Sequence, residues 1–205
     1  GEVPVRLTAK PEDINQMSNK FTNLGYAIDA LEYWWGPYAW ERVGYVLTTQ
    51  GALEIPTNTA YPRSMIEESV YANSDLFSHE LGHQWWGNIV APSIHNHMWI
   101  KEGAAEYSSH LYIEWKDGHE DFVNLVKDNQ QFVLEECHVQ DEGFHPMSPM
   151  PDEHIYGRHT YYKGASIHHN LRAYLGDELY REACQAAIAT NFDSHMDPAG
   201  FIEVL

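Results

Sequence analysis

The chain has 205 residues, of which 43% are hydrophobic and 13% aromatic, enough to build one core and too many for a disordered segment. Thirty Asp and Glu against 12 Lys and Arg leave a formal charge of −18, which would repel a nucleic-acid backbone, and no basic cluster offsets it. No apolar run approaches the ~20 residues of a membrane-spanning helix. We therefore expect an acidic globular domain with no nucleic-acid partner and no membrane span.

The first elements in chain order are an amphipathic helix and a short sheet. Apolar residues recur at threes and fours over Glu12–Trp35, which predicts one helix that the following Gly-Pro pair ends. The stretch Arg42–Pro56 is rich in Val, Tyr, Leu and Thr, which favours strands. Because Gly51 and Pro56 would interrupt a hydrogen-bond ladder, we expect these strands at a sheet edge.

The remainder of the chain predicts mainly helices. Asn73 or Ser74 is expected to cap a helix over Asp75–Gly87, whose acidic first residue suits the positive end of the helix dipole. Pro92 and the polar run His95–His97 then form a connection. Four further stretches have helical periodicity: Trp99–Trp115, Asp121–Cys137, Tyr161–Tyr174 and Asp177–Ala189.

The organisation of the chain predicts one domain over residues 1–205, since no repeat or flexible linker divides it. Asp197 and Pro198 are typical of a helix N-cap and first helical residue, and about one turn follows. A helix so short is marginal by itself, so we expect the chain to be part of a longer protein. Cys137 and Cys184 lack the spacing of a thiolate zinc site and leave both disulfide pairing and cellular compartment open.

The strongest chemical signal is the H-E-x-x-H run over residues 79–83. Four residues advance a helix by about one turn, so His79 and His83 share a face and can bind one metal ion. A second predicted helix carries Glu102 after a gap of 18 residues. Two imidazoles and one carboxylate form a catalytic zinc set that leaves a fourth position for water. The simpler alternative makes the histidines ordinary helix-face residues and Glu102 a solvated charge.

The residues around this run extend the pattern. The sequences H-E-L-G-H-Q-W-W-G-N at 79–88 and W-I-K-E-G at 99–103 resemble the zinc signature of the aminopeptidase N and leukotriene hydrolase family, and the likeness runs from about Gly36 to the C-terminus. The resemblance implies an α+β, predominantly helical, thermolysin-like zinc peptidase catalytic domain, with a small edge sheet near the N-terminus. It also implies one Zn²⁺ ion held by His79, His83 and Glu102.

The same resemblance implies that Glu80 is the general base. Zinc lowers the pKa of its bound water from 15.7 to about 7 and polarises the scissile carbonyl. A carboxylate beside that water can take its proton and later transfer it to the departing amine.

Three further site residues follow from the resemblance. The run Y-Y-K-G at 161–164 matches the family's Tyr-x-Lys-Gly element, which implies that Tyr161 donates to the oxyanion and that Tyr156 is a second pocket tyrosine. The run G-A-L-E at 51–54 matches the family's exopeptidase strand. That match implies that the carboxylate of Glu54 binds the free amine of the substrate.

The sequence departs from the family pattern in two places. Leu53 and Ile55 replace the usual Met and Asn, which leaves open the shape of the first side-chain pocket and the exopeptidase specificity. Ser109 stands seven residues after the third ligand, where members tend to have an acid. Glu106, four residues after Glu102 on the same helix face, is our candidate for the carboxylate that orients a metal-bound histidine, and a solvated side chain is the alternative.

The other histidines are expected to be structural or exposed, because none comes with an ordered third ligand. They form three groups: His95 with His97, His154 with His159, and His168 with His169.

These observations predict a zinc-dependent aminopeptidase that hydrolyses the N-terminal residues of peptides. An endopeptidase or a bifunctional hydrolase would keep the metal with a different substrate. A non-catalytic zinc-stabilised binding module would need only the metal ligands. The presence of Glu80 and Tyr161, the implied general base and oxyanion donor, argues against this alternative. The resemblance also implies an N-terminal β-rich domain and a C-terminal helical domain outside these 205 residues, so we expect the present piece to bind zinc and to turn substrate over poorly.

Overall fold

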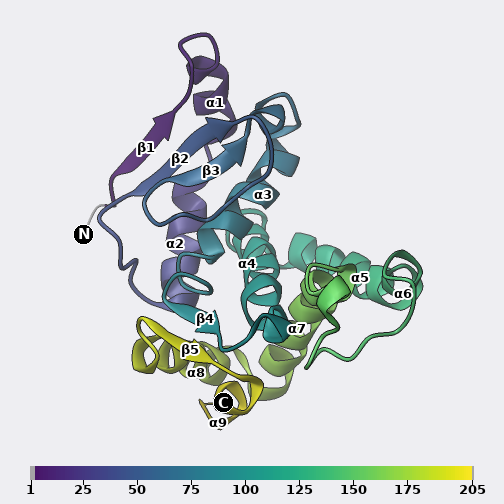
Figure 1. Ribbon diagram of the computed structural model, residues 1–205. Helices are drawn as coiled ribbons and strands as arrows, with labels where there is room; N and C mark the ends of the chain where they lie inside the picture. Colours follow the sequence, from purple (N-terminus) through teal and green to yellow (C-terminus); the bar gives the residue numbers. More distant parts are fainter. Residues whose placement is uncertain (1–2, 205) are drawn as a thin grey trace.

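The computed structural model describes residues 3–204, and helices account for most of them (Figure 1). The helices are α1 (Ile14–Lys20), α2 (Leu24–Trp35), α3 (Val70–Gly82), α4 (Trp99–Asp117), α5 (His119–Glu135), α6 (Cys137–Gln140), α7 (Gly164–Leu175), α8 (Asp177–Thr190) and α9 (Pro198–Val204). The strands are β1 (Val5–Thr8), β2 (Val43–Thr48), β3 (Thr59–Pro62), β4 (Val90–Pro92) and β5 (Ser194–Met196). The expected predominantly helical α+β class is confirmed.

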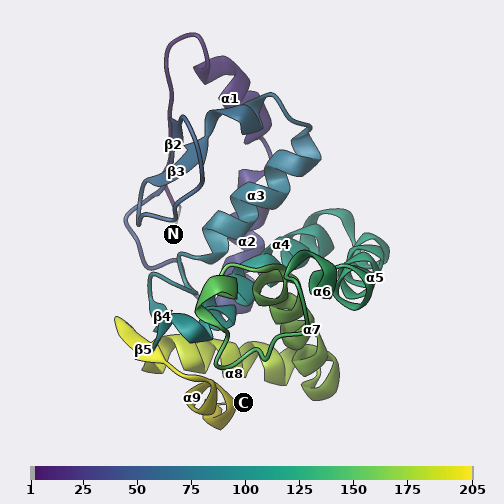
Figure 2. The ribbon, with the colours of Figure 1, turned by 45° about the vertical axis from the view of Figure 1, so that its right-hand side comes forward.

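The two sheets lie at opposite ends of the molecule. The sheet of β1, β2 and β3 lies beside α1 at one end, and the β4–β5 pair lies with α8 and α9 at the other (Figure 1, Figure 2). Helices α3, α4 and α7 occupy the space between them (Figure 2). The HExxH run lies at the end of α3, Glu102 lies on α4, and Tyr161 lies in the turn directly before α7.

The prediction of one continuous helix over Glu12–Trp35 is wrong, because this segment forms two helices, α1 and α2. The Lys20 carbonyl, which would accept from the Leu24 N–H in a continuous helix, accepts from Asn73 Nδ2 at 2.7 Å. The Leu24 N–H donates to the Phe21 carbonyl at 3.0 Å. A side chain from α3 thus replaces one backbone hydrogen bond of the helix, and the local sequence pattern does not predict this replacement.

The first sheet is parallel throughout, in the order β1-β2-β3. The expectation that Arg42–Pro56 supplies edge strands is therefore wrong for β2, which is central. Gly51 and Pro56 lie beyond the end of β2 and do not interrupt its ladder. The segment around Leu53 instead forms an isolated antiparallel bridge with Ala60 on β3.

Helix α3 begins five residues earlier than expected and ends five residues earlier. Ser69 is the N-cap, and its Oγ accepts from the Ala72 N–H at 3.0 Å. Ser74, the expected cap, lies inside the helix and donates its hydroxyl to the Val70 carbonyl at 2.7 Å. Regular helix ends at Gly82, so His83 is the C-cap residue. Both histidines of the motif nevertheless stay one turn apart.

The later helices match the expected ranges closely. The helix expected over Asp121–Cys137 starts two residues earlier, at His119. The first residues of the helix expected over Tyr161–Tyr174 belong instead to a π-helical turn over His159–Lys163. Asp197 caps α9 as expected, with its Oδ1 accepting from the Gly200 N–H at 2.8 Å.

Two glycines set the distances between the helices that carry the site. A Cβ on Gly82 of α3 would lie 2.5 Å from Ser108 Oγ of α4, so a larger residue would push these helices apart. A Cβ on Gly103 of α4 would lie 2.6 Å from the Cα of Gly164 at the start of α7. Gly103 follows Glu102 and Gly164 closes the motif that begins at Tyr161, so the second contact fixes how closely those two elements approach.

No helix within residues 3–204 combines the length and the apolar character needed to cross a bilayer. Cys137 and Cys184 are both buried and both carry free thiols.

Candidate metal centre and active site

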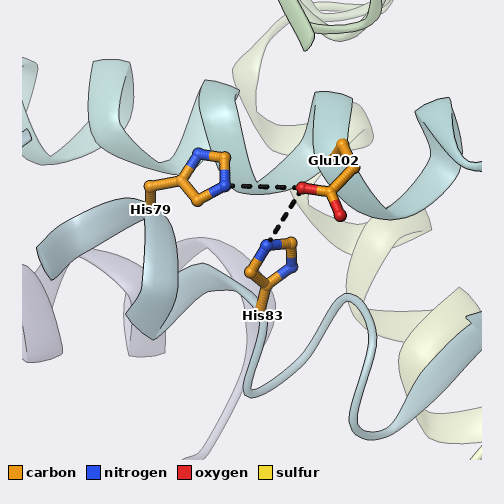
Figure 3. A group of neighbouring side chains, drawn as sticks. All are labelled: His79, His83 and Glu102. Carbon is orange, nitrogen blue, oxygen red and sulfur yellow. Dashed lines mark ion pairs between the residues drawn. The ribbon is translucent and has the colours of Figure 1, made fainter. Parts of the chain in front are cut away.

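The side chains of His79, His83 and Glu102 converge on one point between α3 and α4 (Figure 3). Glu102 Oε2 lies 3.5 Å from His79 Nε2 and 3.2 Å from His83 Nε2. Ligand atoms at 2.0–2.2 Å from a tetrahedral zinc ion lie about 3.3 Å from one another. The three atoms therefore have the spacing that one small divalent cation needs.

The outer nitrogens of both imidazoles have acceptors. His79 Nδ1 lies 3.1 Å from Glu106 Oε2, and His83 Nδ1 lies 2.9 Å from the Trp86 carbonyl oxygen. A carboxylate and a carbonyl only accept, so both Nδ1 atoms carry a hydrogen and both Nε2 atoms face Glu102. This tautomer is the one that metal binding through Nε2 requires.

The electrostatics of the cluster favour positive charge at its centre. Burial lowers the pKa of His79, but Glu102 and Glu106 outweigh burial and hold that pKa well above its usual value. Burial raises the pKa of Glu102, yet the two histidines and Lys101 hold it well below its usual range. A bound divalent cation would replace the proton that this arrangement attracts, so the donor set fits a zinc ion.

Glu80 lies in the same cavity, which has a volume of about 510 Å³. Its side chain is 5% exposed, and its Oε2 atom has no hydrogen-bond partner within the described residues. Burial is the largest effect on the pKa of Glu80 and raises it, against the opposing effect of His83 and His79. A buried carboxylate oxygen with no partner needs a donor from outside the chain, such as a water molecule or a substrate.

Glu54 lies at the His83 end of the cavity. Its carboxylate forms an ion pair with Lys101 Nζ, and its backbone carbonyl accepts from Asn88 Nδ2 at 2.7 Å and from Gln84 Nε2 at 3.3 Å. Both amides belong to the zinc signature, so the segment after the HExxH run holds the Glu54 backbone. Burial raises the pKa of Glu54, but His83 and Lys101 outweigh it and leave that pKa below its usual value.

Lys101 is a site residue to which the sequence analysis gave no role. Its ammonium also lies 3.0 Å from Glu102 Oε1, so it bridges Glu54 and the third metal-ligand candidate. Its position directly before Glu102 in the W-I-K-E-G run could have indicated that it lies near the metal site. The neighbouring sequence does not indicate that it contacts Glu54.

The two tyrosines implied by the resemblance both line the cavity. The ring of Tyr161 stacks on that of His79, with centroids 5.9 Å apart and an angle of 24° between the planes. Burial raises the pKa of Tyr161 above its usual value, so its phenol is a hydrogen-bond donor at neutral pH. Tyr156 is 60% exposed and lies at the rim.

Asp75 is a second lining residue that the sequence analysis did not assign to the site. It precedes His79 by four residues, so it lies on the same face of α3, one turn further from His83. Burial, followed by the charge of Glu106, raises the pKa of Asp75 to about 6. The helical spacing was the signal that could have placed it here.

The remaining histidine pairs lie elsewhere. His95 bonds Asp152, His159 bonds Asp141, and His168 bonds the Tyr180 hydroxyl. Within residues 3–204, the groups of side chains close enough to hold one ion all include His83.

The chain is similar to known peptidases. A model of the peptidase family M1 domain matches residues 14–205. The chain is 30% identical over 170 residues to the probable aminopeptidase 2 of Sulfurisphaera tokodaii, which covers 80% of this chain and 20% of that protein. It is 30% identical over 128 residues to aminopeptidase N of Oryctolagus cuniculus, which covers 56% of this chain and 13% of that protein.

Solved structures share the fold. Native leukotriene A4 hydrolase from Saccharomyces cerevisiae has a TM-score of 0.81 and 18% identity over 97% of this chain and 33% of that chain. An M1 zinc metallopeptidase from Deinococcus radiodurans has a TM-score of 0.77 and 23% identity over 89% of this chain and 39% of that chain.

The family match covers nearly the whole sequence, whereas the chain spans only about a fifth of the length of the first of these curated relatives. The family implies zinc, in agreement with the donor set of His79, His83 and Glu102. The chain belongs to peptidase family M1.

Proposed function

We propose that residues 1–205 are the catalytic domain of a longer zinc-dependent aminopeptidase that hydrolyses the N-terminal residues of peptides. The observation that carries the proposal is the convergence of two imidazole Nε2 atoms on one Glu102 oxygen, at 3.5 and 3.2 Å, beside the unpartnered carboxylate oxygen of Glu80.

His79, His83 and Glu102 would hold one zinc ion, which when bound supplies a Lewis acid that polarises the scissile carbonyl and acidifies water. Glu106 and the Trp86 carbonyl act on the other side of the imidazoles. By accepting from the Nδ1 hydrogens, they keep the Nε2 atoms directed at Glu102.

Glu80 is the proposed general base. Its buried oxygen accepts a proton from the attacking water and transfers it to the departing amine. The raised pKa of this carboxyl supports that role, because a base whose pKa lies nearer the working pH can both accept and return a proton.

Tyr161 is the proposed donor to the carbonyl oxygen as negative charge develops on it. Its phenol is directed to the cavity by the stack on His79 and remains protonated at neutral pH. A donor placed before the reaction stabilises the developing charge without reorganisation. Tyr156, at the rim, would contact the substrate.

Glu54 is the proposed binding group for the substrate amine. Its side chain is 14% exposed at one end of the cavity, and a charge-assisted bond to an ammonium there would fix the first residue of the peptide. The ion pair between Glu54 and Lys101 favours the endopeptidase alternative, because an ammonium from the chain already neutralises this carboxylate. Cleavage of a peptide but not of its N-acetylated form would exclude that alternative.

The decisive test compares Glu80→Gln with the exposed control Glu12→Gln in the natural polypeptide that carries this chain. Glu80→Gln is expected to retain about one zinc per chain by elemental analysis and to lose roughly 10²–10⁴-fold in kcat on a leucine amide, the usual contribution of a general base. Glu12→Gln is expected to match the wild type. Full turnover by Glu80→Gln would remove it from the base role.

The relatives' greater length supports a contribution from flanking domains of the same polypeptide. Residues 1–205 alone are expected to bind zinc and to cleave peptides poorly, with activity restored in the longer chain. Equal kcat/KM for the two forms would show that the flanking parts are dispensable.

A further inference from the structure

A second hollow adjoins the active-site cavity. It has a volume of about 270 Å³, and its wall is shared with the first cavity through Asp75 and Glu106. Its other lining residues come from α3, α4, α5 and the π-helical turn: Tyr71, His110, Leu125, Asp128, Asn129, Phe132 and Tyr162.

The hollow contains a buried acceptor that the described part of the chain leaves unpaired. Asn129, 6% exposed, leaves its Oδ1 atom without a donor, and the ring of His110, 3% exposed, lies on the same wall. Burial lowers the pKa of His110 to about 4, so the ring is neutral and offers a lone pair at neutral pH. A buried acceptor such as Asn129 Oδ1 normally has a partner, so it can take a donor from outside the chain.

The charge of the hollow is negative. Asp75 and Asp128 contribute carboxylates without an ion-pair partner within residues 3–204, and Glu106 is shared with His79. Lys101 is the basic side chain of the neighbouring cavity, and it is committed to Glu54 and Glu102 at the opposite end. Aromatic rings complete the wall, with Phe132 and Tyr162 centroids 4.5 Å apart. Aromatic faces and carboxylates together suit an organic cation.

The order of groups along α3 indicates which part of a peptide reaches this hollow. Glu54 lies near His83, and Asp75 lies one turn beyond His79, about 6 Å further along the helix axis. If Glu54 binds the amine of the first residue, the first peptide bond faces the metal ligands. An extended chain advances about 3.5 Å per residue, so the side chain after the scissile bond is the first to reach Asp75.

We infer that this hollow binds the cationic side chain of the substrate's second residue, arginine in preference to lysine, with Asp75 as its main partner. The inference rests on the proposed aminopeptidase function. A guanidinium has five N–H donors and a flat face, which match carboxylates, the unpaired Asn129 Oδ1 and aromatic walls, whereas an ammonium has three donors.

The test uses the zinc-loaded natural polypeptide and two dipeptides, Leu-Arg and Leu-citrulline, which differ by one charge at nearly equal shape. We expect a kcat/KM ratio of about ten or more in favour of Leu-Arg, the scale of a charge-assisted hydrogen bond. Asp75→Asn should reduce the ratio to about two, and Asp128→Asn, at an exposed position, should reduce it less. The exposed control Asp29→Asn should leave it unchanged. Because the ratio is taken within each variant, a loss of folded protein or of zinc cancels.

A binding measurement separates this inference from the function on which it rests. Calorimetric titration of Glu80→Gln with the same dipeptides should give the same preference in Kd without turnover. Cleavage of both dipeptides at equal kcat/KM, or a ratio that Asp75→Asn does not change, would overturn the inference and leave the peptidase proposal intact. Failure of the wild type to cleave any peptide would instead overturn the proposed function.

Discussion

The two ends of the active-site cavity are supported in different ways. At the metal end, His79, His83 and Glu102 lie on or directly after helices α3 and α4, which approach closely at Gly82. At the amine end, Glu54 lies in a segment joined to β3 by one isolated bridge. Two side-chain amides and the Lys101 ammonium complete its support.

The metal end is therefore held more rigidly than the amine end. Helical backbone bonds and packed glycines fix the metal end, so the positions of the ligands depend on the whole helix pair. The amine end depends on individual side-chain bonds, each of which contributes about 1 kcal/mol. We therefore expect substitutions at the metal end to affect zinc and stability, and substitutions at the amine end to affect substrate affinity alone.

The largest effect is expected from His83→Ala. If the ~10–16 kcal/mol of a four-ligand zinc site is shared equally among its ligands, one imidazole contributes about 2.5–4 kcal/mol. Competition with a chelator should show that affinity loss, and peptide cleavage should disappear with it. His95→Ala, which removes an exposed histidine outside the cavity, should keep both. Unchanged zinc affinity in His83→Ala would break the assignment of the metal end.

Gly103→Ala should have the next largest effect. Its new Cβ would overlap the backbone of Gly164, which has no side chain that can move, so we expect a loss of about 1–3 kcal/mol in the free energy of unfolding. The displacement of α7 should also lower kcat through Tyr161. Gly25→Ala on α2 meets nothing within 4 Å and should stabilise by about 0.5–1 kcal/mol, so denaturant unfolding should give opposite signs for the two variants.

Glu106→Ala tests how much the metal end depends on a residue outside the ligand set. Removing the acceptor of His79 Nδ1 should weaken zinc binding by about 10–100-fold, as loss of such an orienting carboxylate typically does. The exposed variant Glu12→Ala should not change zinc affinity. Equal chelator competition for both variants would mean that Glu106 is only a cavity-lining charge.

The smallest effect is expected from Asn88→Ala at the amine end. The Glu54 carbonyl would lose one donor, so KM for a peptide with a free amine should rise about five-fold, equivalent to ~1 kcal/mol. Zinc affinity should stay at the wild-type value, and the exposed variant Asn19→Ala should change neither quantity. A parallel loss of zinc would contradict the separation of the two ends.

Much of the candidate site could be predicted from short-range pattern. The four-residue spacing of His79 and His83 fixes their common face in any helix, and four residues likewise relate Glu102 to Glu106. The amphipathic periodicity of the later helices was equally readable, because burial of one face imposes it. The α9 cap at Asp197 follows from the hydrogen-bond chemistry of its own side chain.

Tertiary structure alone decided which of these faces meet. The break at Lys20 depends on Asn73, the central place of β2 depends on strands on both sides, and the position of Glu54 depends on Gln84, Asn88 and Lys101. Each of these contacts joins residues more than ten positions apart, so no local propensity encodes it. The sequence by itself determined the chemistry available on each helix, and the packing of the helices determined which groups share one cavity.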